Sequence, residues 1–188
     1  AKGVDNSGAL TAGRDAAINA VDAITNSGAM TATNGSAAIA STKGTVVNAA
    51  TGTMTAGTNA TIQALGNIKN SGAVTANKGR IDIISYNGSI ANTDSAALEA
   101  KGGNVTLQSK KELENKGDAK ASADVVLKSL ESSVANAGNL NATGGASITA
   151  KTDARNSGTI NATIGNASIA ADASVNNSGT MTAGSAAS

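Results

Sequence analysis

A short motif recurs along the whole chain and constrains its fold more than any other feature of the sequence. The motif reads Asn-Ser-Gly-x-aliphatic-Thr/Asn-Ala, and its third position returns at intervals of 20 to 24 residues. A period of this length is typical of solenoids, in which each repeat forms one turn and buries its apolar face against its neighbours. The sequence therefore predicts about nine coils, anchored at Gly8, Gly28, Gly52, Gly72, Ala96, Gly117, Gly138, Gly158 and Gly179.

Apolar residues fill three fixed positions in these repeats, and they alternate with polar residues as the side chains of a β-strand do. The first column holds Leu10, Met30, Met54, Val74, Leu98, Ala119, Leu140, Ile160 and Met181. The second column holds Ile18, Ile39, Ile62, Ile83, Leu107, Leu127, Ile148 and Ile169. The third column holds Ile24, Val46, Ile68, Ile90, Leu113, Val134, Ala154 and Val175.

Three short strands per repeat predict an all-β fold, a parallel β-helix of triangular coils. Connections between parallel strands are overwhelmingly right-handed, so we expect a right-handed helix. At a strand spacing of about 4.8 Å, nine coils would form a rod on the order of 43 Å long.

We expect residues 1–188 to form a single domain. Because the sequence begins and ends in mid-repeat, we also expect it to be the interior shaft of a longer protein.

An asparagine follows the third column by two residues in every repeat, at Asn26, Asn48, Asn70, Asn92, Asn115, Asn136, Asn156 and Asn177. The Ser-Gly that often comes next predicts a tight turn, so we expect these asparagines at a corner of each coil, with left-handed backbone angles. The amide of each one would bond to the same amide one coil away. The pattern indicates a structural role rather than catalysis or ligand binding.

The composition excludes several classes of protein. Leu, Ile and Val make up less than a fifth of the chain and Tyr86 is its one aromatic residue, which is too little apolar material for an ordinary globule. There is no cysteine and no histidine, so zinc fingers, disulfide frameworks and Ser-His-Asp or Cys-His nucleophiles are excluded. The 14 basic and 13 acidic residues are evenly mixed, so nucleic acid is not an expected partner. No metal or cofactor is expected.

Charges become dense between Glu99 and Glu131. In the register of the repeat, Glu99 and Lys120 take the outward position that threonine fills in other coils, so they should lie one above the other, about 5 Å apart. This stretch has two interpretations. It is either a set of solvated ion pairs between coils or, with Glu99, Asp118 and Lys120 at its centre, a belt that contacts a receptor.

Other functions of β-helices fit the sequence less well. Enzymes with this architecture act on acidic polysaccharides with clustered Asp, Lys and Arg, but Asp82 stands alone between Thr61 and Thr106 and no paired carboxylates emerge. We therefore do not expect an enzyme. An ice-binding face would need an unbroken threonine column, and Glu99 and Lys120 interrupt it.

The repeats resemble a known family. Asn6-Ser7-Gly8-Ala9-Leu10-Thr11-Ala12 and Asn156-Ser157-Gly158-Thr159-Ile160-Asn161-Ala162 are similar to the filamentous haemagglutinin repeats of large bacterial exoproteins exported by two-partner secretion. The resemblance covers essentially the whole chain. It implies a fibre that is secreted from, or displayed on the surface of, a Gram-negative bacterium and exported through an outer-membrane partner transporter.

Two functions follow from this resemblance. In the first, the chain belongs to the shaft of an adhesin that binds a glycan or protein receptor on host cells, or a receptor on neighbouring bacteria. In the second, it is an inert, rigid stalk of a contact-dependent growth-inhibition or haemolysin exoprotein and presents a distal receptor-binding or toxin module. The small, polar outward residues favour the stalk slightly, because binding hot spots are usually Trp, Tyr or Arg.

Overall fold

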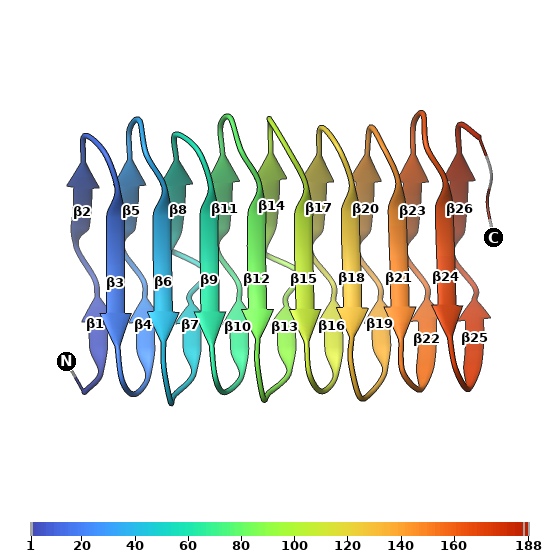
Figure 1. Ribbon diagram of the computed structural model, residues 1–188, viewed down its shortest axis with the longest axis horizontal. Coiled ribbons are helices and arrows are strands. Elements are labelled where there is room, and N and C mark those ends of the chain that lie inside the picture. The colour runs from blue at the N-terminus through green and yellow to red at the C-terminus, as the bar shows by residue number, and fades with distance from the viewer. Residues whose placement is uncertain (1, 186, 188) are drawn as a thin grey trace.

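A computed structural model describes residues 2–185 and 187, which form 26 strands in three parallel sheets (Figure 1). Sheet A consists of β1 (Val4–Asn6), β4 (Ile24–Asn26), β7 (Val46–Asn48), β10 (Ile68–Asn70), β13 (Ile90–Asn92), β16 (Leu113–Asn115), β19 (Val134–Asn136), β22 (Asp153–Asn156) and β25 (Ser174–Asn177). Sheet B consists of β2 (Ala9–Ala12), β5 (Ala29–Ala32), β8 (Thr53–Ala56), β11 (Ala73–Ala76), β14 (Ala97–Ala100), β17 (Asp118–Ala121), β20 (Asn139–Ala142), β23 (Thr159–Ala162) and β26 (Thr180–Ala183). Sheet C consists of β3 (Ala16–Ala20), β6 (Ala37–Ser41), β9 (Ala60–Ala64), β12 (Ile81–Ser85), β15 (Val105–Ser109), β18 (Val125–Ser129), β21 (Ala146–Ala150) and β24 (Ala167–Ala171).

The coils stack as the repeat predicts. Each strand pairs with the equivalent strand of every adjacent coil, so that sheets A, B and C each run along the whole rod. In Figure 1 the strands of sheet C lie in front and run downward, those of sheets A and B lie behind and run upward, and the chain advances from left to right. That sense of rotation is right-handed. The predicted right-handed parallel β-helix of about nine coils is confirmed.

The core consists of inward-facing columns that run the length of the rod. The pairing has no offset, because Val74 lies opposite both Met54 and Leu98 in its neighbouring strands. The three aliphatic columns are buried through the middle of the rod. A further inward column, which the repeat motif did not indicate, is the alanine that ends every strand of sheet B, such as Ala56 and Ala76. Small inward residues let one coil be closed by three short strands with little aliphatic material.

The anchor glycines provide space rather than unusual backbone angles. None of the residues that the structure describes has a positive φ angle, so the prediction of left-handed angles at the asparagine corner is wrong. Instead, a Cβ atom on Gly28 would overlap the carbonyl oxygen of Gly8, and one on Gly72 would overlap that of Gly52. Only glycine therefore fits at these positions, where the corner of one coil lies directly against the corner of the coil before it.

Buried serines stabilise turns between sheets C and A. The last residue of a sheet C strand faces inward and is Ser41, Ser85 or Ser129 in the three coils whose turn has four residues. The Ser85 hydroxyl donates to the carbonyl oxygen of Gly66 at 2.7 Å and accepts from the amide of Gly88 at 3.0 Å. Ser109 is buried at the same position before a three-residue turn and donates to the carbonyl oxygen of Lys111 at 2.7 Å, so the serines satisfy backbone groups of three-residue and four-residue turns alike.

We predict that Ile83→Asp unfolds the coils around it, whereas Thr55→Asp has little effect. Ile83 is fully buried between Ile62 and Leu107, and an unpaired carboxylate there should cost more than about 4 kcal/mol. Thr55 lies on the outer face of sheet B between uncharged threonines, so its variant should change stability by less than about 1 kcal/mol. Thermal melts followed by circular dichroism test this, and equal stability of the two variants would contradict the register.

Candidate functional site

The predicted asparagine column forms one continuous chain of side-chain hydrogen bonds. The amide nitrogen of each asparagine donates to the amide oxygen of the asparagine one coil further on, with N···O distances between 2.7 and 2.8 Å. The same chain starts one coil earlier, where Asn6 donates to Asn26 at 2.7 Å. From Asn26 to Asn156 the side chains are buried at the inward-facing end of the sheet A strands. A ladder so enclosed stabilises the stack and offers no group to a ligand.

The three central residues of the charged stretch lie together on the outer face of sheet B. Glu99 and Lys120 are directly opposite in β14 and β17, and their carboxylate oxygen and ammonium nitrogen are 3.3 Å apart. Lys101 approaches the other oxygen of Glu99 at 3.8 Å. Asp118, on β17, accepts a hydrogen bond from Asn139 at 2.7 Å. The register prediction for Glu99 and Lys120 is confirmed, and all three predicted belt residues have partners within the rod.

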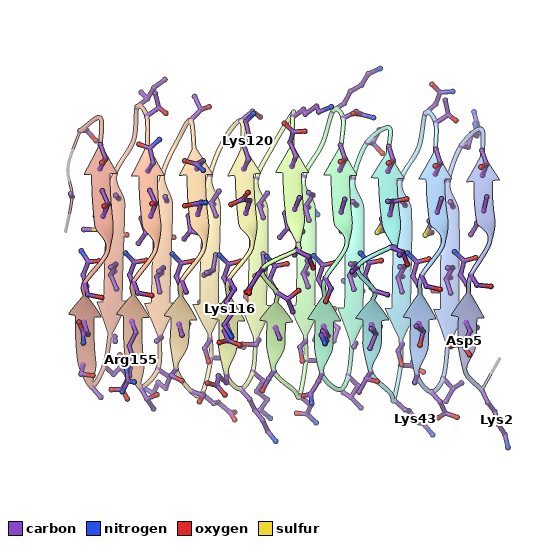
Figure 2. The ribbon with its side chains drawn as sticks, turned by 180° about the vertical axis from the view of Figure 1, so that it is seen from behind. Lys2, Asp5, Lys43, Lys116, Lys120 and Arg155 are labelled. Carbon is purple, nitrogen blue, oxygen red and sulfur yellow. The ribbon has the colours of Figure 1, made fainter. Side chains whose placement is uncertain are left out.

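The remaining charges of this stretch lie on other sides of the rod, so they form a ring rather than a patch. Glu114 and Lys116 pair at 2.8 Å at the edge of sheet A, and Figure 2 shows Lys116 well separated from Lys120. Lys110 and Glu131 are 3.6 Å apart at the corner between sheets C and A. The hydrogen bond that Lys116 donates to the Glu114 carboxylate raises the pKa of Lys116 above its ordinary value, so its ammonium group stays charged at higher pH.

A row of exposed hydrophobic side chains, which the repeat motif did not indicate, follows one corner of the rod. Val21, Leu65, Tyr86 and Leu130 are each between 38% and 54% exposed, and each directly follows the last residue of a sheet C strand. The alternation of side chains along a strand could have located them. Each lies two residues after an outward position of its strand, so its own large apolar side chain also points to solvent. They mark the one corner of the rod with recurring apolar surface among the residues described.

Within residues 2–185 and 187, no three His, Cys, Asp or Glu side chains gather closely enough to hold a metal ion. Asp82 is bound to Arg80 of its own coil, and this pairing raises the pKa of Arg80. No helix in the described part of the chain is long and apolar enough to cross a membrane.

Comparison with known proteins does not place the chain in a family. No protein-family model matches it, and neither a curated protein nor a solved structure is significantly similar to it.

We predict that Asn70→Ala destabilises the rod by about 2 to 5 kcal/mol. The substitution leaves the buried donor of Asn48 and the buried acceptor of Asn92 without partners, and each such group costs about 1–3 kcal/mol. The control is Asn19→Ala, an exposed outward position in β3, where we expect a change within about 0.5 kcal/mol. Chemical denaturation measures both, and similar losses would show that the ladder contributes nothing specific.

We also predict that the ion pair of Glu99 and Lys120 contributes little to stability. The two side chains are 38% and 69% exposed, and pairs of this kind contribute about 0 to 1 kcal/mol. A double-mutant cycle with Glu99→Gln and Lys120→Gln should give a coupling within that range that declines at high salt. A larger, salt-independent coupling would contradict a purely solvated pair.

Proposed function

We propose that this chain is part of the extended, surface-exposed shaft of a secreted bacterial adhesin of the filamentous haemagglutinin type and that it serves attachment to host cells. The observation that carries the proposal is the uninterrupted stacking of about nine coils in perfect register, with three sheets and one amide ladder running through all of them. Such a rod holds a long surface at a fixed distance and orientation. The repeat motif supports the type of protein, and export through an outer-membrane partner transporter belongs to the same proposal.

Attachment by such a rod would rest on many weak contacts. Short corners leave it without a deep cleft, so each contact buries little area, but equivalent outward positions recur at every coil. When several weak sites sit on one stiff scaffold, binding at the first raises the effective concentration at the others. A host glycan or protein receptor presented in many copies is the kind of partner that suits this arrangement.

One observation favours the alternative, an inert stalk that carries a receptor-binding or toxin module of a contact-dependent inhibition or haemolysin exoprotein. Acidic residues of the charged ring already have basic partners in the same chain, since Glu99, Glu114 and Glu131 each have a lysine within 4 Å. A charge that already has a partner gains less from a receptor, because binding must first break the existing pair.

The two functions are distinguished by binding of the 188-residue chain, displayed in many copies on beads, to epithelial cells and separately to bacterial cells. We expect saturable binding to epithelial cells. A matched variant with Glu99→Gln, Asp118→Asn and Lys120→Gln tests whether the belt takes part, and its loss of binding would place attachment there. Binding to neither kind of cell would contradict the adhesin proposal and support the stalk, whereas binding to bacteria alone would point to interbacterial targeting.

A further inference from the structure

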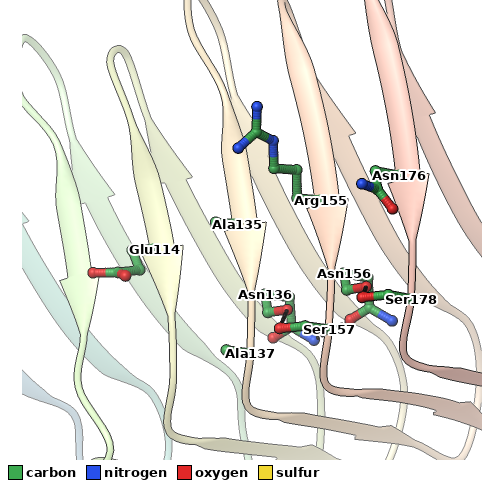
Figure 3. Close-up of a pocket in the computed structure, with 9 residues that line it drawn as sticks. All are labelled: Glu114, Ala135, Asn136, Ala137, Arg155, Asn156, Ser157, Asn176 and Ser178. Atoms are coloured by element: carbon green, nitrogen blue, oxygen red, sulfur yellow. Dashed lines mark hydrogen bonds between the residues drawn. The ribbon is translucent and has the colours of Figure 1, made fainter.

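A shallow depression on the outer face of sheet A has the features of a small binding site. It spans β16, β19, β22 and β25 and has a volume of about 240 Å³ (Figure 3). Its floor is the methyl group of Ala135, and its walls include Glu114, Arg155, Ser157, Asn176 and Ser178. It lies apart from the three predicted belt residues, which belong to sheet B.

The depression arises from the order of residues in one outward column. Glu114, Ala135 and Arg155 occupy the same middle position in three successive sheet A strands. At about 4.8 Å per coil, the two long side chains start roughly 10 Å apart, with only a methyl group between them.

The guanidinium group of Arg155 is available to a ligand. Arg155 is exposed, and the ion pairs of the described residues do not include it. Figure 3 shows its side chain leaning toward β19, over the floor of the depression. Two carboxylates of neighbouring sheet A positions already have partners: Glu114 is held by Lys116 at 2.8 Å, and Asp153 accepts a hydrogen bond from the Ser174 hydroxyl at 2.5 Å. A free guanidinium presents paired donors that match a carboxylate.

The other walls offer hydroxyl and amide groups. The hydroxyls of Ser157 and Ser178 donate only long hydrogen bonds, at 3.5 and 3.4 Å, to the carbonyl oxygens of Asn136 and Asn156, and their oxygens remain free to accept. Asn176 lies at the far side of the depression from Glu114. Closely spaced hydroxyl and amide groups beside an apolar floor suit a ligand that has several hydroxyls and one C–H face.

We propose that this depression binds a sugar ring bearing a carboxylate, with the carboxylate on Arg155, ring hydroxyls on Ser157, Asn176 and Ser178, and the C–H face on Ala135. Sialic acid at the end of a glycan and a uronic acid within an acidic polysaccharide share this chemistry. The inference rests on the proposed adhesive function, to which it adds a class of ligand.

Titration calorimetry of the 188-residue chain tests the proposal with 3′-sialyllactose, digalacturonic acid and, as a neutral control, lactose. We expect weak, saturable binding of at least one acid and none of lactose. Arg155→Gln should weaken binding about tenfold or more, as expected for the loss of a charge-assisted hydrogen-bonded pair. The matched control Arg14→Gln removes the same charge from an exposed turn between β2 and β3 and should bind like the unchanged chain.

A second variant separates shape from charge. Ala135→Leu fills the floor without altering any charge and should also abolish binding, while circular dichroism verifies that the outward substitution leaves the fold intact. Equal weakening by Arg155→Gln and Arg14→Gln, or full binding by Ala135→Leu, would overturn the site. Arg155-dependent binding of a glutamate-rich peptide as tight as that of the sugars would overturn the ligand class.

The outcome is distinguishable from failure of the adhesive function. A chain that binds epithelial cells but neither acidic sugar overturns this inference and leaves attachment to another surface. A chain that binds an acidic sugar through Arg155 but no cells supports the site and contradicts the adhesive function. Binding of neither overturns both.

Discussion

The structure depends on exact registration between coils. The buried asparagines bond from coil to coil, and their ladder makes the register strict, because each buried amide must meet the next at 2.7 to 2.8 Å. A slip of one residue would bring outward residues into the core and leave a row of amides unpaired. The ladder therefore specifies which pairing is allowed, and the aliphatic columns supply most of the apolar burial.

The exact register also explains how a chain with so few large apolar residues folds. Each coil contributes only a few large side chains, such as Ile62, Met54 and Ile68, but they stack on their equivalents and lose contact with water from both sides. A backbone whose donors and acceptors pair between coils needs no bulky interior to exclude water from them. Outward residues do not have to match their neighbours in the next coil. Residues as different as Thr75, Glu99 and Lys120 therefore follow one another in a single outward column.

The sequence predicts the coils, the strands and the residues that face inward, because side-chain direction alternates strictly along a strand. It fails where one residue type serves two physical purposes. Ser-Gly after Asn26 is as consistent with a left-handed turn as with close contact between coils, and only the position of the Gly8 carbonyl distinguishes the two. The sequence also does not show that the charges between Glu99 and Glu131 form a ring. They are close together in sequence but fall on successive sides of the rod. The Arg155 depression needs four successive coils to be seen together, which no local pattern reveals.

Short turns that bind each coil only to its two neighbours give the rod an uncommon response to tension. A pull on one end loads the hydrogen bonds of the last coil first, because no connection reaches beyond the adjacent coil. Coils would then peel away one at a time while the rest of the rod stays folded. Each released coil of 20 to 24 residues adds roughly 70 to 80 Å of extended chain. A rod built in this way would lengthen in steps under load and dissipate mechanical energy at each step.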